Sequence, residues 1–431
     1  MSPLGPPSAA GTLEAWLDWQ QSLHPTAIEL GLERVARVLG RTGWRRPARP
    51  VITVGGTNGK GSCVALLEAM LRAGGYRVGS FTSPHLLDYR ERIRLDGRLV
   101  SEGSLLAAFG RIAAALGPDS LTFFEFNTLA ALLVLETFDP DVLVLEVGMG
   151  GRLDAVNVVD ADVALIASIG LDHTEWLGAD VESIGREKAG IFRRGQPAVC
   201  AMAAPPASVA AAAAEVGARL LLRGRDFEAT ERSDGRWDYS SARQRRTALP
   251  RPALPGRVQF GNAAAVIATL DELSSRLPLR REAIERGLTT VSLPGRFQRL
   301  ADPRGFEWVL DVAHNVDAAR VLAENLREYP VPGRTIAVCG MLGDKDIGAV
   351  LRVLAGDISQ WLAASTSGPR GLTDAELVAR GAAADVVLTA AGSVTEALAR
   401  AAATAREGDR VLVFGSFHTV GPALSALGND L

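Results

Sequence analysis

Cysteine is scarce in this sequence of 431 residues, and the cysteines present lie far apart. They are Cys63, Cys200 and Cys339. Such spacing predicts neither a disulfide framework nor a zinc site, because both need paired or clustered cysteines. Few, scattered cysteines are typical of a reducing compartment, so we expect a cytoplasmic protein.

Long apolar runs and long basic runs are also missing. No uninterrupted hydrophobic stretch is long enough to span a bilayer, and residues 1–10 lack the basic start and apolar core of a signal peptide. The formal net charge is −3. These features argue against nucleic acid and against a membrane as partners. We expect a monomer that acts on small molecules.

Lysine is the least common charged residue. Lysine and arginine total 46, but the only lysines are Lys60, Lys188 and Lys345. Arginine has replaced lysine wherever a generic cation suffices, so the remaining lysines are candidates for tasks that need a compact ammonium or a reactive amine. Chance retention is the alternative for each. Histidine is scarce too, and most histidines follow apolar, strand-like runs: His85, His173, His314 and His418.

A glycine-rich turn, Gly56-Thr-Asn-Gly-Lys-Gly-Ser62, follows a β-branched run and leads into an apolar-periodic stretch. A strand, a turn and a helix in that order direct backbone N–H groups and the positive end of the helix toward an anion, and Lys60 adds a point charge. The usual phosphate loop has Ser or Thr directly after Gly-Lys, where the hydroxyl holds Mg²⁺. Gly61 occupies that position here, so a metal bound with ATP must find its ligands elsewhere.

Polar residues at the ends of three other strand-like runs are the candidates. Ser83, Glu146 and His173 each follow such a run. In a parallel α/β sheet, ligands gather at the carboxyl ends of the strands. Plainer interpretations exist: a turn serine that caps local backbone, a solvated glutamate and a buried structural histidine. The glycine-rich loop after Glu146 favours a functional interpretation, because it allows close backbone approach.

The length of the chain predicts two domains. Residues 12–41 indicate two helices separated by His24-Pro25-Thr26, and residues 90–100 indicate a small hairpin. Residues 223–256 are typical of a few antiparallel strands. Leu293-Pro-Gly-Arg-Phe-Gln298 interrupts the pattern, and we place the domain boundary there, which gives domains 1–295 and 296–431.

Beyond this boundary, strand-like runs alternate with helical stretches. The runs are 308–311, 335–339, 360–364, 386–388 and 410–414. Alternation of this kind predicts a second, smaller doubly wound domain.

Several motifs, in this order, resemble those of the folylpolyglutamate synthase/dihydrofolate synthase family, within the wider Mur-ligase group of ATP-dependent amide-bond-forming enzymes. The matching segments span nearly the whole chain: Gly56–Ser62 with Gly61 included, Ser83–Leu86, Leu145–Asp154, Leu171–His173, Glu187–Gly190, Pro294–Phe297, Asp311–Asn315 and Gly340–Asp346. One such motif alone is weak evidence for the family, but this many motifs in the same order are strong evidence. The resemblance implies an α/β fold with a P-loop-type parallel-sheet ATP-binding domain and a smaller Rossmann-like α/β domain, with ATP between them.

The resemblance also implies roles for individual residues. Ser83, Glu146 and His173 correspond to magnesium ligands, and Lys188 to a lysine that is carbamylated and serves a second Mg²⁺. A carbamate supplies anionic oxygen ligands where an ammonium would be repelled, and arginine cannot form it. The implied ATP-binding residues are Gly56, Thr57, Asn58, Gly59, Lys60, Gly61, Ser62, Asn262, Arg296 and Asp311. The implied catalytic residues are Lys60, Lys188 and His314. Lys345 is expected in the same cleft as His314, and the roles of Lys345 and His418 stay open.

The implied reaction has two steps. A substrate carboxylate attacks the γ-phosphate of ATP to give an acyl phosphate, and the amine of L-glutamate then displaces phosphate. Segments that resemble the dihydropteroate-holding parts of bifunctional bacterial enzymes contain Thr26, Thr122, Phe124, Glu125, Leu153, Asp154 and Ala155. They favour an enzyme that adds the first glutamate to 7,8-dihydropteroate and later ones to reduced folates. Val156 departs from the small polar residue that many relatives carry.

Three alternatives stay open. A monofunctional folylpolyglutamate synthase would share the motifs of the ATP site. A cell-wall-type Mur ligase normally carries an additional N-terminal domain, for which the phosphate loop begins too early here. A nucleotide-switch or scaffold protein would use ATP turnover to drive conformation and not synthesis.

Overall fold

The computed structural model describes residues 5–8 and 11–428, so part of the segment 1–10 considered for a signal peptide lies outside the described residues. The chain forms two compact units. The first consists of the chain up to Pro84, Arg90–Pro252 and Phe260–Val291. The second consists of His85–Tyr89, Ala253–Gln259 and Ser292–Leu431. Two short segments from the earlier part of the chain therefore belong to the second unit.

The first unit is built on an eight-stranded sheet with the order β4-β3-β2-β5-β1-β6-β7-β8. Its strands are β1 (Val51–Gly55), β2 (Val78–Phe81), β3 (Ile93–Leu95), β4 (Arg98–Leu99), β5 (Val142–Glu146), β6 (Val163–Ile166), β7 (Pro197–Cys200) and β8 (Arg219–Leu222). The strands β2, β5, β1, β6, β7 and β8 pair in parallel, in that spatial order. The strands β3 and β4 add an antiparallel hairpin at the β2 edge. The inner strands are continuous apolar runs, as buried parallel strands require.

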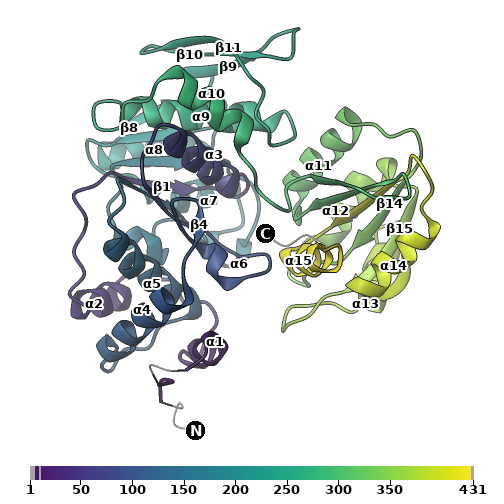
Figure 1. Cartoon of the computed structure of the whole chain (residues 1–431), viewed down its shortest axis with the longest axis horizontal. Helices are drawn as coiled ribbons and strands as arrows, with labels where there is room; N and C mark the ends of the chain where they lie inside the picture. The colour runs from purple at the N-terminus through teal and green to yellow at the C-terminus, as the bar shows by residue number, and fades with distance from the viewer. Residues whose placement is uncertain (1–4, 9–10, 429–431) are drawn as a thin grey trace. The chain divides into compact units, whose positions relative to one another are not determined.

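Helices flank this sheet (Figure 1). They are α1 (Leu13–Ser22), α2 (Glu33–Arg41), α3 (Lys60–Ala73), α4 (Glu102–Ala115), α5 (Phe123–Phe138), α6 (Thr174–Leu177), α7 (Val181–Ala189), α8 (Ala207–Val216), α9 (Val258–Glu272) and α10 (Arg281–Thr290), with short 3-10 turns η1 (Tyr89–Arg92) and η2 (Ala155–Val158). The helices α1, α2, α4 and α5 pack against one another. An aromatic cluster joins three of them, because Trp16 of α1 and Phe126 of α5 both contact Phe109 of α4.

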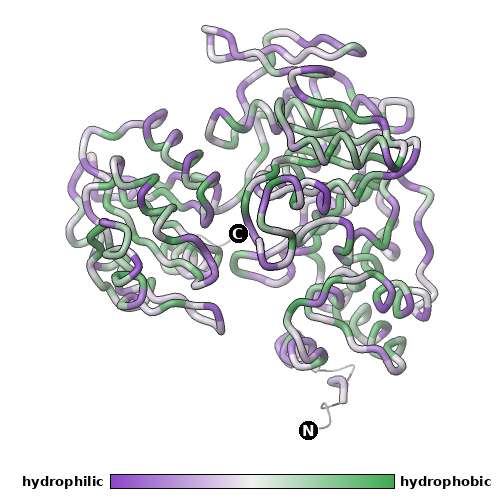
Figure 2. The backbone as a smooth tube through the Cα atoms, turned by 180° about the vertical axis from the view of Figure 1, so that it is seen from behind, coloured by the Kyte–Doolittle hydropathy of each residue, from purple (hydrophilic) through white to green (hydrophobic). Residues whose placement is uncertain are grey.

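A separate three-stranded antiparallel sheet has the order β11-β10-β9. Its strands are β9 (Phe227–Glu231), β10 (Trp237–Ser241) and β11 (Arg245–Leu249), and Figure 2 shows that this projecting sheet is largely hydrophilic. The sheet is fastened to α9 by a buried ion pair. Arg246 donates to both oxygens of Asp271 at 3.0 and 2.6 Å, and Tyr239 Oη donates to the same carboxylate at 3.1 Å.

The second unit contains a six-stranded sheet with the order β12-β13-β17-β14-β15-β16. Its elements are β12 (Gln298–Ala301), β13 (Glu307–Asp311), α11 (Val316–Glu328), β14 (Thr335–Cys339), α12 (Ile347–Leu354), η3 (Ala355–Asp357), β15 (Gln360–Ser365), α13 (Asp374–Ala382), β16 (Thr389–Ser393), α14 (Val394–Thr404), β17 (Arg410–Phe414) and α15 (Phe417–Ala426). One hydrophobic cluster joins the sheet to α11, α12 and α13, and another joins it to α14 and α15. Helices therefore cover both faces of the sheet.

The predicted fold class is confirmed: both units are α/β with largely parallel sheets, and residues 223–256 contain antiparallel strands. Three details of the prediction are wrong. The second helix begins at Glu33 and not directly after His24-Pro25-Thr26, because the residues between them bond to distant segments, as Gly31 does to Leu153. The run 386–388 is not a strand, since Val387 is 87% exposed and β16 begins after it. The edge strand β12 pairs antiparallel with β13 and was not anticipated.

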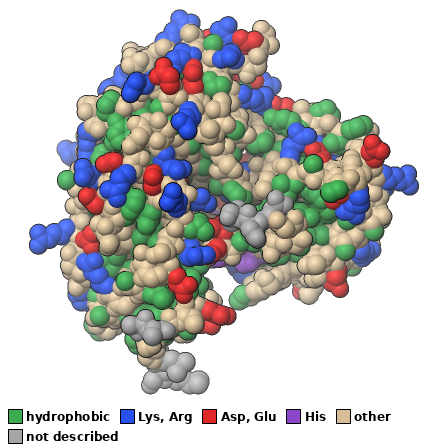
Figure 3. All heavy atoms as spheres, in the orientation of Figure 1, with side chains coloured by type: hydrophobic (Ala, Val, Ile, Leu, Met, Phe, Trp, Pro, Cys, Tyr) green, Lys and Arg blue, Asp and Glu red, His purple; other side chains and the backbone are tan. Residues whose placement is uncertain are grey.

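The surface carries charges of both signs. Figure 3 shows arginine and lysine side chains interspersed with aspartate and glutamate on the face drawn. Within the described residues, no helix combines the length and the apolar character needed to cross a bilayer.

We expect Asp271→Ala to destabilise the first unit by about 3–5 kcal/mol, because it leaves the Arg246 guanidinium and the Tyr239 hydroxyl buried without their carboxylate. Urea unfolding monitored by the fluorescence of the buried Trp237 measures this change. Arg243 is a matched control, since its side chain is 54% exposed and pairs with Glu272, which also pairs with Arg219. Arg243→Ala should cost at most about 1 kcal/mol. Equal losses in both variants would contradict this account.

Candidate active site

The phosphate loop lies between β1 and α3 and is held in place by the segment that follows β6. The backbone N–H of Thr57 donates to Ser168 O at 2.7 Å, and the N–H of Asn58 donates to Ser168 Oγ at 2.9 Å. Thr57 Oγ1 accepts from the N–H of Gly170 at 3.0 Å. These bonds connect the loop to the segment after β6 at several points.

Glycines are required at two positions of the loop. Gly56 has φ 146° and Gly59 has φ 83°, which are conformations that residues with a Cβ rarely adopt. A Cβ on Gly59 would lie 3.3 Å from Asn262 Oδ1, so α9 brings Asn262 against the loop. Lys60 Nζ donates to Gly56 O at 2.9 Å and to Thr57 O at 3.2 Å. The ammonium is therefore held over the loop, where an anion would meet it.

The predicted metal-binding residues follow strands that are neighbours in the sheet. The parallel strands β2, β5, β1 and β6 are consecutive in the sheet. In that spatial order, Ser83 follows β2, Glu146 is the last residue of β5, the phosphate loop follows β1 and His173 follows β6. Ser83 and Glu146 are in contact, because the N–H of Ser83 donates to Glu146 Oε2 at 3.3 Å. Glu146 is only 4% exposed. His173 has a left-handed backbone, φ 52°, and its Nε2 lies 4.0 Å from Asp172 Oδ2.

Lys188 lies near the end of α7 and is only 3% exposed. Burial, together with the nearby charge of Lys60, lowers the pKa of its amine to about 7, although Asp172 and Asp154 oppose this shift. An uncharged amine is therefore accessible near neutral pH, which is unusual for lysine.

The glycine-rich loop after Glu146 packs against α7, which explains its composition. A Cβ on Gly151 would lie 2.7 Å from Glu187 O, and the N–H of Arg152 donates to the same carbonyl at 2.8 Å. A Cβ on Gly190 would lie 2.5 Å from Arg152 Cα. The close approach anticipated from sequence is thus an approach of two backbones, and it positions Lys188 and Asp154.

Asp154 is a buried acid with backbone partners. It is 2% exposed, and it accepts from the N–H of Met149 at 2.9 Å and from the N–H of Val156 at 3.0 Å. Burial raises its pKa from 3.8 to about 6, against the lowering effect of these N–H groups and of Lys60. The shared electrostatic influences connect Asp154, Lys60 and Lys188 in one site.

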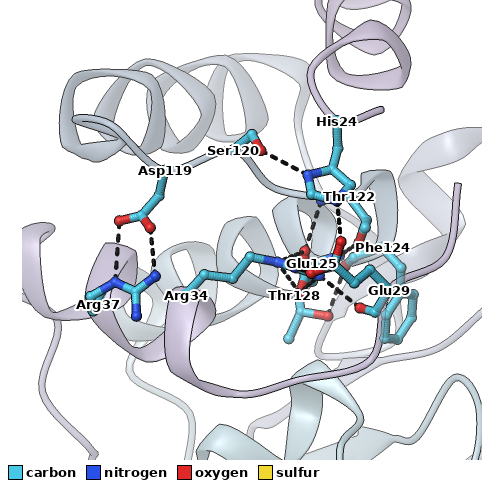
Figure 4. A network of polar contacts seen from close by, with 10 residues as sticks. All are labelled: His24, Glu29, Arg34, Arg37, Asp119, Ser120, Thr122, Phe124, Glu125 and Thr128. Atoms are coloured by element: carbon cyan, nitrogen blue, oxygen red, sulfur yellow. Dashed lines mark hydrogen bonds and ion pairs between the residues drawn. The ribbon is translucent and has the colours of Figure 1, made fainter. Parts of the chain in front are cut away.

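The segments predicted to hold the pterin lie together in the first unit. Phe124 covers Gly148, since a Cβ there would lie 2.5 Å from the ring, and the N–H of Gly31 donates to Leu153 O at 3.2 Å. Thr122 and Glu125 form the capping box of α5. Figure 4 shows that Glu125 also faces Arg34, which donates to both carboxylate oxygens at 2.9 and 3.0 Å. Thr26 is exposed in the neighbouring loop, and Ala155 is buried.

The remaining predicted residues belong to the second unit. Asp311 ends β13 and accepts from the N–H groups of Phe297 and Ala313, each at 2.8 Å. Burial raises its pKa, whereas Arg296 and His314 lower it, so these three side chains form one electrostatic group. The Arg296 guanidinium lies 5.2 Å from the centre of the Phe417 ring. Lys345 lies beside Asp344, and burial lowers the pKa of His418.

Sequence reasoning missed several residues of the site. Ser168 gave no signal because its role is a contact with a loop 110 residues away. Asp172 was visible in the motif around His173 but received no role, although it is one of the acids that influence Lys188. The partnership of Arg34 with Glu125 spans 91 residues and has no local sequence signature.

The side chains predicted to bind magnesium include few anions. Among the residues described, no three His, Cys, Asp or Glu side chains come together as a metal site. The predicted ligands include only one acid and one imidazole, Glu146 and His173, with the hydroxyl of Ser83. Mg²⁺ accepts such incomplete protein sets, because phosphates and water complete its octahedron. The residues fit a metal that arrives with a nucleotide.

Known proteins match the whole of this architecture. Residues 54–270 match the Mur ligase middle domain, and residues 295–417 match the Mur ligase glutamate ligase domain. The dihydrofolate synthase/folylpolyglutamate synthase of Escherichia coli K12 is 44% identical over 98% of this chain and 97% of its own length. The chain belongs to the dihydrofolate synthase/folylpolyglutamate synthase family.

Solved structures of family members agree with this assignment. The structure of E. coli FolC in complex with DHPP and ADP matches with a TM-score of 0.92 and 43% identity, covering 98% of this chain and 99% of that one. A bifunctional folylpolyglutamate synthase/dihydrofolate synthase with Mn, AMPPNP and L-glutamate bound matches with a TM-score of 0.90 and 44% identity, covering 98% and 99%. This member of the family is therefore an ATP-dependent ligase, and the expectation from the sequence motifs is confirmed.

We expect the stability of the protein to respond to the ionisation of Asp154. Its pKa is about 6 in the folded protein, against 3.8 when exposed. The folded state holds the proton more tightly, so stability falls as pH rises from 4 to 6.5. Relative to Asp154→Asn, which does not titrate, wild-type protein should lose about 2 kcal/mol across this range. Urea unfolding at each pH measures the difference, and the constant cost of the lost acceptor in the variant cancels. An unchanged difference would show that Asp154 has an ordinary pKa.

Proposed function

We propose that this protein adds L-glutamate to 7,8-dihydropteroate, forming dihydrofolate, and adds further glutamates to reduced folates. The observation that carries the proposal is the first unit's combination of a phosphate loop, polar strand ends and three converging pterin segments. The bound ligands of the relatives, DHPP with ADP in one and AMPPNP, Mn and L-glutamate in another, support the same pair of activities. A monofunctional folylpolyglutamate synthase is the alternative, and the substrate tests below distinguish the two.

Two bond exchanges make up the reaction. A carboxylate oxygen of the pterin or folate substrate bonds to the γ-phosphorus of ATP, and the bond from that phosphorus to ADP breaks. The neutral amine of L-glutamate then bonds to the acyl carbon, the bond to phosphate breaks, and the nitrogen loses a proton. Both steps join groups that carry negative charge, so alignment and charge neutralisation are the main tasks of the protein.

The phosphate loop performs the first of these tasks in our proposal. Backbone N–H groups of residues 56–62 and the start of α3 receive the phosphates. The Lys60 ammonium, which contacts the carbonyls of Gly56 and Thr57, exchanges part of this contact for a phosphate oxygen. Asn262, held against Gly59, contacts the nucleotide from α9. Arg296, Asp311 and His314 remain proposed nucleotide-contacting or catalytic residues of a second domain that we place at 296–431.

Ser83, Glu146 and His173 are the proposed residues that hold magnesium. When bound, Mg²⁺ neutralises charge on the triphosphate and on the developing transition state. The contact of Ser83 with Glu146 supports this set, as does the position of β2, β5 and β6 within four consecutive parallel strands, with β1 and its phosphate loop between β5 and β6. The set also accounts for Gly61, because the hydroxyl missing from the loop is supplied by Ser83.

Lys188 is proposed to react with carbon dioxide at Nζ and to serve a second magnesium as a carbamate. The reaction consumes a neutral amine and releases a proton. Near-complete burial with Lys60 nearby supports the proposal, because both disfavour an ammonium at this position. The carbamate would add an anion to a site that otherwise has few.

The function is tested by the release of ADP from ATP and magnesium with purified protein. We expect release to require both L-glutamate and a pterin substrate, either dihydropteroate or tetrahydrofolate, and mass spectrometry should find the product one glutamate heavier. Activity with tetrahydrofolate alone would identify a monofunctional polyglutamate synthase. Equal ADP release without glutamate and pterin would contradict the ligase and favour a nucleotide switch.

The role of Lys188 is tested by substitution. Lys188→Arg keeps a long cation but cannot form a carbamate, so we expect turnover to fall by about 100-fold or more while the melting temperature stays within a few degrees. Removing carbon dioxide and bicarbonate should lower the activity of wild-type protein, and small carboxylates should partly restore Lys188→Ala. Full activity of Lys188→Arg would show that the carbamate account is wrong.

A further inference from the structure

The loop between α1 and α2 has no regular secondary structure from residue 23 to residue 32, yet side chains fix it firmly. His24 Nε2 lies 2.9 Å from Glu29 Oε2, so the imidazole donates to the carboxylate across a turn of the loop. Its other nitrogen, Nδ1, lies 2.7 Å from Ser120 Oγ, which belongs to the segment before α5. The first half of the loop is thereby connected to the neighbourhood of Thr122.

Arg34 continues this connection from the start of α2. Its guanidinium donates to Glu29 O at 2.7 Å and also pairs with the Glu29 carboxylate. The same guanidinium donates to both oxygens of Glu125, and one of them, Oε2, also accepts from the N–H of Thr122 at 2.8 Å. Figure 4 shows these side chains as one continuous network from Ser120 to Glu125.

The end of the loop is connected to the third pterin segment. The N–H of Gly31 donates to Leu153 O at 3.2 Å, next to the buried Asp154. Residues 24–31 are thus tied to the segment around Thr122 at one end and to the segment around Leu153 at the other. A change in the conformation of residues 24–31 would therefore break hydrogen bonds to both of these segments.

Exposure within the network is uneven. The side chains of His24, Arg34 and Glu125 are 9%, 14% and 4% exposed, whereas that of Glu29 is 51% exposed. Glu29 is therefore the member that water reaches most easily, and both His24 and Arg34 depend on it. An exposed ion pair adds little to global stability, so its loss should change the loop more than the fold.

We propose that Ser120, His24, Glu29, Arg34 and Glu125 form a latch that holds residues 24–31 as one wall of the pterin pocket and so determines affinity for dihydropteroate. These are positioning residues, and the inference rests on the proposed function. ATP binding is independent of the latch, because the phosphate loop is held by Ser168 and Gly170 after β6. A network that served only general stability would lower the melting temperature and leave substrate affinities alone.

The test uses His24→Ala, Glu29→Ala and the conservative Glu29→Gln in the full-length protein. Equilibrium binding of dihydropteroate, the KM for ATP, the melting temperature and amide hydrogen exchange of residues 24–31 are measured for each. Arg37→Ala is the matched control, since Arg37 is also on α2 and its guanidinium pairs with the Asp119 carboxylate at 2.6 Å, an ion pair drawn apart from the one between Arg34 and Glu125 (Figure 4).

We expect dihydropteroate affinity to fall about tenfold in both alanine variants, the size expected for losing one charged hydrogen bond. Exchange of residues 24–31 should accelerate, while the KM for ATP stays within about twofold. Glu29→Gln, which keeps an acceptor for Arg34, should recover part of the affinity, and Arg37→Ala should bind as wild type does.

Two results would overturn the latch: faster exchange of the loop with unchanged dihydropteroate affinity, or unchanged exchange together with unchanged affinity. Equal loss of affinity in Arg37→Ala would also overturn it, because the effect would then be general. Failure of the proposed function is a separate outcome. It would appear as wild-type protein that neither binds dihydropteroate nor couples it to ADP release, whereas the exchange data would still report whether the network holds the loop.

Discussion

Parallel pairing of four neighbouring strands is the constraint on which the candidate site depends. Because β2, β5, β1 and β6 run in the same direction, their carboxyl ends meet at one edge of the sheet. Ser83, Glu146, the phosphate loop and His173 are therefore delivered together by segments that are distant in sequence. The substitution of Gly61 for a hydroxyl residue has a structural counterpart, since Ser83 follows β2, two strands from β1, and contacts Glu146 at the end of the strand between them.

The site contains several charged side chains that are buried, among them Glu146, Asp154 and Lys188. Lys60 and Lys188 repel each other, so each raises the free energy of the other's charged form. Burial raises the pKa of Asp154, and the backbone N–H groups and Lys60 offset only part of that shift. Close-approach glycines make this arrangement possible, because Gly151 and Gly190 let two backbones touch where side chains would separate them. In this way the backbone contacts support the proposed chemistry of Lys188.

Features that depend on residues close together in the sequence could be predicted, whereas contacts between residues far apart in the sequence could not. The phosphate loop, the strand ends and the alternation of strands and helices are local patterns, and the structure agrees with them. The latch around His24 could not be predicted, since its hydrogen bonds join residues about 90 positions apart. Residues 386–388 looked like a strand because Val387 is apolar, but its exposure is decided by tertiary context. The glycines of the loop after Glu146 predicted a close backbone approach, but the sequence did not identify α7 as the element approached.

The central claim is that the polar strand ends and a modified Lys188 hold divalent metal beside the phosphate loop. A crystal structure with a non-hydrolysable ATP analogue and Mn²⁺, with anomalous diffraction recorded for manganese, tests it most directly. We predict an anomalous peak in contact with Ser83, Glu146 and His173, and a second peak beside carbamate density on Lys188 Nζ. Peaks confined to other residues, with an unmodified lysine, would contradict the account.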